Sequence, residues 1–280
     1  MATPKATALL YLRDAKLLNH TTTISSIRPF STVEEANRDL FKTATDADYI
    51  LIAEETIFHP QGGGQPSDEG TLEKAHAGPS STITESFQIT AVRMDAVDEG
   101  KVLHLIRATD QQSPADLQPG DRVELTVDAE KRNLYSRLHT AGHVLGSAVR
   151  ALVEDSVENF DETKASHFPD SAACEFSGSI EGKWKESIQA RVNEYLERAM
   201  PVEILYWSEE DFHSNGLARL VPDRRLLPIG EDKFRVVRIV GADTYPCGGT
   251  HVDTTDLCGA TTVKKISRSK GNSRVSYTVA

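Results

Sequence analysis

The sequence has few cysteines, no long hydrophobic run and no recognisable leader. Its 280 residues include only Cys174, Cys247 and Cys258, an odd and sparse set that excludes the disulfide framework of small secreted domains. The longest apolar runs, as at 49–53, are far shorter than the roughly 20 residues that span a membrane. The first 30 residues lack a signal-peptide pattern. We therefore expect a cytoplasmic protein with reduced thiols and no membrane segment.

Acidic residues outnumber basic ones. The chain carries 31 Lys and Arg against 42 Asp and Glu, a formal net charge of −11. The overall acidity argues against a protein that coats nucleic acid non-specifically, because such binding depends on neutralising phosphates. One stretch differs, since from Leu257 to Ala280 there is no acidic residue. Its basic residues, Lys264, Lys265, Arg268, Lys270 and Arg274, predict a local cationic patch, or alternatively the solvated face of a terminal hairpin.

The pattern of apolar residues changes near Asp128. Before it, short β-rich runs at 8–12, 49–53, 83–92 and 123–127 are separated by Gly and Pro. After it, apolar residues recur in steps of four and three, which predicts a helix; they are Leu134, Leu138, Ala141, Leu145, Ala148 and Leu152. A second helix is expected over 180–199, capped by Ser179 and ended by Pro201, followed by strands at 234–240 and 274–279. The pattern predicts an α+β chain with a boundary near residue 130.

Two pairs of side chains have the spacing of metal ligands. His139 and His143 are four apart on the first helix, on the side away from its apolar stripe, a pattern that alone is more typical of a solvated face. Cys247 and His251 enclose two glycines, which predicts a tight turn. Three nitrogens and one sulfur form a zinc-like ligand set, although CGGTH alone could be a glycine turn with a buried Cys.

The same residues argue against a metalloprotease. No glutamate follows His139, so the general base of the HExxH motif is missing. If all four ligands come from the protein, no position is left for an activated water. We therefore expect the metal to position substrate more than to generate hydroxide.

Five blocks in fixed order resemble the alanyl-tRNA editing domain and its free-standing form, the AlaX family. They are HPQGGGQPSDEG at 59–70, RLHTAGH at 137–143, ASHFPD at 165–170, CGGTHV at 247–252, and Lys270-Gly271 followed by Arg274. The resemblance implies a small N-terminal β-barrel-like domain with the glycine motif over 1–128. It also implies an α+β zinc-binding editing domain over 129–280.

The activity that the resemblance implies is hydrolysis of tRNA(Ala) mischarged with serine, or with glycine, without ATP. In the family the four motif residues bind one zinc ion, here His139, His143, Cys247 and His251. Family members embedded in synthetases often have threonine where this chain has Gly142. The alternatives are a catalytically silent tRNA- and zinc-binding module, or editing of another mischarged tRNA.

Several residues are candidates for contact with the substrate. Gly63 and Gly64 can expose backbone N–H groups, and Gln65, Thr140 and Thr250 can hydrogen-bond a serine hydroxyl. Lys270 and Arg274 are candidates for phosphate contact. The sequence identifies no general base: His167 could serve, but a structural role is the more common use of such a residue. It also gives no oligomeric state.

Overall fold

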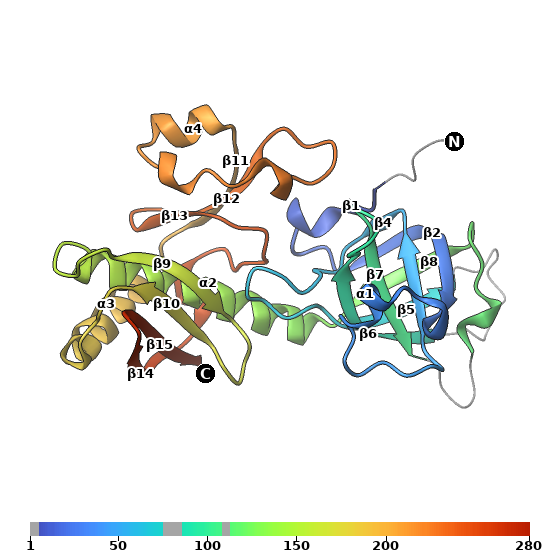
Figure 1. Ribbon diagram of the computed structural model, residues 1–280, viewed down its shortest axis with the longest axis horizontal. Coiled ribbons are helices and arrows are strands. Elements are labelled where there is room, and N and C mark those ends of the chain that lie inside the picture. The colour runs from blue at the N-terminus through green and yellow to red at the C-terminus, as the bar shows by residue number, and fades with distance from the viewer. Residues whose placement is uncertain (1–5, 75–85, 108–112) are drawn as a thin grey trace. The chain divides into compact units, whose positions relative to one another are not determined.

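The computed structural model describes residues 6–74, 86–107 and 113–280, which form two compact units (Figure 1). The first unit comprises Met1–Gly62 and Ser67–Arg132, and the second comprises Gly63–Pro66 and Asn133–Ala280. Residues 63–66 therefore belong by their contacts to the second unit, although their sequence lies inside that of the first. No helix of the described residues is long and apolar enough to cross a membrane.

The first unit is built on a closed barrel of six antiparallel strands in the order β2-β3-β7-β6-β5-β8 (Figure 1). These strands are β2 Asn19–Pro29, β3 Tyr49–Ala53, β5 Gly70–Lys74, β6 Ser86–Met94, β7 Val102–Arg107 and β8 Arg122–Val127. The shorter elements are β1 Ala8–Leu9, β4 Glu55–Thr56, α1 Glu35–Arg38, and 3-10 helices at Leu10–Leu12, Phe30–Thr32 and Pro114–Asp116. A barrel is what the resemblance predicts for this part of the chain.

Apolar side chains fill the barrel, and one histidine lies among them. Leu51, Leu72 and Leu125 have no exposed surface. His104 is equally buried, with Nδ1 3.2 Å from the Leu51 carbonyl oxygen and Nε2 2.8 Å from Oγ1 of Thr56. Burial lowers the pKa of His104 to about 4, so the neutral imidazole is part of the folded barrel.

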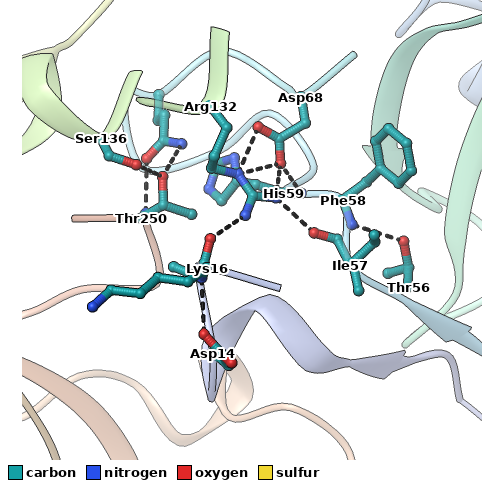
Figure 2. Close-up of polar contacts among 12 residues, drawn as sticks. Asp14, Lys16, Thr56, Ile57, Phe58, His59, Asp68, Arg132, Ser136 and Thr250 are labelled. Atoms are coloured by element: carbon teal, nitrogen blue, oxygen red, sulfur yellow. Dashed lines mark hydrogen bonds and ion pairs between the residues drawn. The ribbon is translucent and has the colours of Figure 1, made fainter. Parts of the chain in front are cut away.

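A buried ion pair ties together distant segments of the first unit. Arg132 and Asp68 are 4 % and 0 % exposed and lie 2.5 Å apart (Figure 2). The Arg132 guanidinium also donates to the carbonyl oxygen of Ile57 at 2.6 Å, and the backbone N–H of His59 donates to Asp68 at 2.6 Å. Burying an unpaired charge costs several kcal/mol of folding free energy, so removal of either side chain would destabilise the first unit.

The second unit contains two antiparallel sheets and the longest helix. Its four-stranded sheet has the order β14-β15-β10-β9, and its three-stranded sheet the order β11-β12-β13. The strands are β9 Asp161–Ser166, β10 Ala173–Ser177, β11 Val202–Trp207, β12 Phe234–Ile239, β13 Asp243–Pro246, β14 Thr261–Ser269 and β15 Asn272–Val279. The helices are α2 Ala129–Val153, α3 Lys185–Glu197 and α4 Glu209–Ser214, with 3-10 helices at Gly182–Trp184, Ala218–Leu220, Arg224–Leu226 and Thr255–Cys258.

The helix α2 confirms the helix that the sequence predicts after Asp128. Asp128 caps its start by accepting hydrogen bonds from the backbone N–H groups of Glu130 and Lys131. The predicted apolar stripe lies in the core, but burial is not confined to that face: every residue from 138 to 149 is buried. Other segments of the chain therefore cover the face that carries the two histidines.

The second predicted helix is correct in type and wrong in its start. The structure begins α3 at Lys185, after the short 3-10 helix, and Ser179 does not cap it. The predicted start is wrong because Ile180, although fully buried, lies in a segment without regular secondary structure. Its backbone N–H donates to Oγ of Ser273 at 2.8 Å.

Candidate metal centre

Two of the four candidate ligands come from one turn of α2. His139 is 1 % exposed and His143 is 9 % exposed. Their rings stack with centroids 5.0 Å apart and planes 13° from parallel. This arrangement follows from the helix, because residues four apart lie above one another on one face.

The other two ligands lie in the segment that follows β13. Cys247 begins this segment, and its Sγ lies 3.3 Å from Nε2 of His139 and 3.3 Å from Nε2 of His251. The backbone of Cys247 is held to β12, where its N–H donates to the Arg235 carbonyl oxygen at 3.1 Å and its carbonyl oxygen accepts from Nη1 of Arg235 at 2.6 Å. Two segments distant in sequence thus bring their ligands to one point.

Gly249 allows this close approach. A Cβ built at Gly249 would lie 2.2 Å from the His139 ring and 2.7 Å from Oε1 of Gln65. Its φ is not positive, so the position needs glycine for space rather than for an unusual backbone conformation. The sequence predicts a tight turn here, but glycine is needed at position 249 because a side chain there would collide with the His139 ring.

The donor set fits a tetrahedral zinc ion. The four ligand atoms lie within 4.8 Å of one another. Zn–N and Zn–S bonds of about 2.1 and 2.3 Å in tetrahedral geometry place N and S about 3.6 Å apart, close to the 3.3 Å seen here. Nε2 of His143 is buried and has no hydrogen-bond partner among the described residues, as expected of an atom that serves as a ligand.

The electrostatics of the site favour a neutral imidazole at His143, the form that binds a metal ion. Burial, followed by the charges of His167 and Arg235, lowers the pKa of His143 to about 3. Burial raises the pKa of the Cys247 thiol, while the Arg235 charge and the Gly249 N–H act in the opposite direction. A bound cation would oppose the effect of burial and stabilise the thiolate, because a coordinated thiol loses its proton.

Three of the residues expected to contact substrate lie against these ligands. Gln65, Thr140 and Thr250 are all 0 % exposed. Oε1 of Gln65 is 2.7 Å from Nδ1 of His139, and Oγ1 of Thr140 is 3.1 Å from Nδ1 of His251. Oγ1 of Thr250 accepts from Nε2 of Gln65 at 2.9 Å and from Oγ of Ser136 at 2.8 Å (Figure 2).

The two glycines of the same motif differ in their surroundings. Gly63 is exposed, with φ of +55° and no atom within 4 Å of a built Cβ. Gly64 has φ of +79°, and its built Cβ would lie 2.4 Å from the Ala165 carbonyl oxygen. Its own carbonyl oxygen accepts from the backbone N–H of His167 at 2.8 Å. Gly64 therefore packs the segment against the end of β9.

Lys270 and Arg274 lie at the hairpin between β14 and β15. Lys270 is exposed and, with Gly271, forms the turn, at φ of +51° and +82°. Nη2 of Arg274 donates to the Ser171 carbonyl oxygen at 3.0 Å. Within the described residues, neither side chain shares a hydrogen bond or ion pair with the four candidate ligands.

His167 and Arg235 contact candidate ligands in ways that the sequence does not predict. The His167 ring stacks on His139 with centroids 4.1 Å apart, and Nδ1 of His167 is 2.8 Å from Oη of Tyr277. It fills the space beside Gly142, where a built Cβ would be 2.3 Å from the His167 ring. The sequence names His167 as part of the resemblance and as a possible general base, but it does not predict these contacts, and no sequence signal points to Arg235.

Comparisons with known proteins agree with this picture. Residues 234–276 match the family described as the Threonyl and Alanyl tRNA synthetase second additional domain. Over most of its length the chain is similar to the alanyl-tRNA editing protein AlaX-M of Methanosarcina barkeri, at 26 % identity over 83 % of this chain and 89 % of that protein. It is similar to AlaX-L of Pyrococcus horikoshii at 27 % identity, over 81 % of this chain and 50 % of that protein.

The similarity extends to alanine–tRNA ligases. That of Thermotoga maritima is 29 % identical over 83 % of this chain and 24 % of the ligase. The chain thus spans about a quarter of this ligase and half of AlaX-L. These matches confirm the resemblance read from the motifs.

Proposed function

Because the chain is homologous to the alanyl-tRNA editing proteins and to a segment of the alanine–tRNA ligases, we propose that it is a zinc-dependent aminoacyl-tRNA deacylase. Its proposed substrate is tRNA(Ala) mischarged with serine or glycine, and its proposed place of action is the cytoplasm. The observation that carries the proposal is the convergence of three histidines and Cys247 beside the glycine motif. Hydrolysis of the ester needs no ATP.

His139, His143, Cys247 and His251 would hold one zinc ion, which would supply a fixed positive charge beside the ester. Four protein ligands fill a tetrahedral shell, so we infer that this charge orients the aminoacyl group. Gly63 and Gly64 would present backbone N–H groups to the substrate, and Gly63 is the more accessible. Lys270 and Arg274 would contact phosphates, and the neighbouring Lys264, Lys265 and Arg268 are exposed.

A deacylation assay tests the proposal. The protein is incubated with tRNA(Ala) charged with radiolabelled serine, glycine or alanine, and with serine-charged tRNA(Ser), and ester loss is followed over time. Fast loss from serine- or glycine-charged tRNA(Ala), absent in the His139→Ala/His143→Ala variant, is the expected result.

Two other results would contradict the proposal. Tight binding of tRNA(Ala) with zinc bound but no ester loss would favour a catalytically silent binding module. Loss from serine-charged tRNA(Ser) at the same rate as from serine-charged tRNA(Ala) would contradict recognition of the tRNA.

A further inference from the structure

We propose that Gln65 and Thr140 are positioning residues of the metal centre, each of which fixes the proton of one histidine on Nδ1 and turns Nε2 toward the ion. This inference rests on the metal centre of the proposed function. It assigns to two fully buried side chains a role in metal binding, where the sequence suggested contact with substrate.

The orientation of the Gln65 amide is determined by its contacts. The backbone N–H of Thr250 can only donate, and it lies 3.0 Å from Oε1. The other end of the amide, Nε2, donates to Oγ1 of Thr250 at 2.9 Å. The atom that faces Nδ1 of His139 at 2.7 Å is therefore the oxygen, which can only accept. It follows that Nδ1 of His139 carries the hydrogen.

The contacts of Thr140 determine the direction of its hydrogen bonds in the same way. Its hydroxyl has a single hydrogen, which it donates to the Ser136 carbonyl oxygen at 2.9 Å. Oγ1 then accepts from the backbone N–H of Val252 at 3.2 Å and from Nδ1 of His251 at 3.1 Å. Nδ1 of His251 therefore also carries its hydrogen.

Both histidines consequently present an unprotonated Nε2, and both of these atoms lie 3.3 Å from Sγ of Cys247. A hydrogen-bond acceptor on the far nitrogen fixes the ring orientation and raises the basicity of a metal-binding histidine. Loss of such a partner typically lowers metal affinity ten- to a hundredfold.

The fold holds Gln65 in place from both sides. Gly64, next to it in sequence, packs against Ala165 and is bonded to the backbone of His167. On the other side, Thr250 is bonded both to Gln65 and to Oγ of Ser136, which is one turn before Thr140 on α2. Ser136, Thr140 and Thr250 thus link the glycine motif to α2 and to the CGGTH segment.

The test is zinc affinity, measured by competition with a chromophoric chelator, together with the absorption spectrum of the Co²⁺ form. Gln65→Leu and Thr140→Val remove each acceptor with little change in volume and are expected to weaken zinc binding ten- to a hundredfold. Both are also expected to alter the cobalt bands. Thr140→Ser keeps the oxygen and is expected to stay within about threefold of the native affinity.

Thr255→Val is the matched control. Thr255 is also 0 % exposed and donates to the Tyr195 carbonyl oxygen at 2.6 Å, but it lies outside the metal centre. It is expected to lower stability without changing zinc affinity. Native zinc affinity and native cobalt bands in both Gln65→Leu and Thr140→Val would overturn the positioning role of Gln65 and Thr140 but not the proposed metal centre. If the native chain binds neither metal, the metal centre of the proposed function fails as well.

Discussion

Replacing Gly142 by alanine is expected to destabilise the second unit, although alanine favours an isolated helix. Gly142 lies in α2 between His139 and His143. A Cβ built there would lie 2.3 Å from Cε1 and 2.5 Å from Nδ1 of His167, and 2.8 Å from Oη of Tyr277. Real Cβ atoms essentially never approach a neighbour within 3.0 Å, so the His167 ring must move.

The His167 ring has little room to move. One face is stacked on His139, and Nδ1 is hydrogen-bonded to Oη of Tyr277 at 2.8 Å. Alanine gains about 1 kcal/mol over glycine in a helix. Overpacking costs about 1–3 kcal/mol, and losing the bond between His167 and Tyr277 costs about 1 kcal/mol more. We therefore expect a net loss of about 1–3 kcal/mol in the free energy of unfolding.

Urea unfolding measured by tryptophan fluorescence tests this expectation, because Trp184 and Trp207 both belong to the second unit. Gly182→Ala is the control, since no atom lies within 4 Å of its built Cβ. The control is expected to stay within about 0.5 kcal/mol of the native chain. A Gly142→Ala chain more stable than the native one by about 1 kcal/mol would show helix propensity alone and refute the packing argument.

Three further predictions concern the barrel and the metal ligands. Lowering the pH from 7 to 4 is expected to reduce the free energy of unfolding of the barrel by up to about 3 kcal/mol through His104. The pKa of His104 is 6.5 in the unfolded chain and about 4 in the folded one, so below pH 6.5 only the unfolded chain gains a proton there. The stability is therefore complete above pH 6.5 and is lost as the pH falls toward about 4. Urea unfolding against pH, compared with His104→Gln, checks this, and equal pH dependence in the two chains would contradict it. Asp68→Asn is expected to cost about 3 kcal/mol or more in denaturant unfolding of the first unit, because Arg132 loses its buried counter-charge; an unchanged midpoint would count against that role. Cys247→Ala is expected to abolish stoichiometric zinc binding, measured by elemental analysis after dialysis, and one retained zinc per chain would exclude Cys247 as a ligand.

Local patterns predict those parts of the molecule that depend on neighbours in sequence. The helical period from Leu134 to Leu152 predicts α2 and therefore the stacking of His139 above His143. The β-rich N-terminal runs predict strands, and residues 49–53 coincide with β3. The run 8–12 is a strand only at Ala8–Leu9, because Leu10–Leu12 form a 3-10 helix. Of the run 83–92, residues 86–92 belong to β6, and 83–85 lie outside the described residues. The spacing of Cys247 and His251 indicates a shared ligand point, which their 3.3 Å contact supports.

The hydrogen-bond partners of the ligands could not be predicted in this way. Gln65 and His139 are 74 residues apart, and Thr140 and His251 are 111 apart, so each pairing exists only in the folded chain. Gly142 illustrates the same limit. Its lack of a side chain leaves the space that His167 occupies, and no periodic pattern connects the two positions.

A zinc titration of the metal-free chain, in which the deacylation rate of serine-charged tRNA(Ala) is measured at each step, shows whether activity depends on the proposed metal centre. We expect the rate to rise with added zinc and to stop rising at one equivalent per chain. The His139→Ala/His143→Ala variant should stay at the spontaneous rate throughout. Full activity in the metal-free chain, or an equal rise in the double variant, would contradict a catalytic centre built on His139, His143, Cys247 and His251.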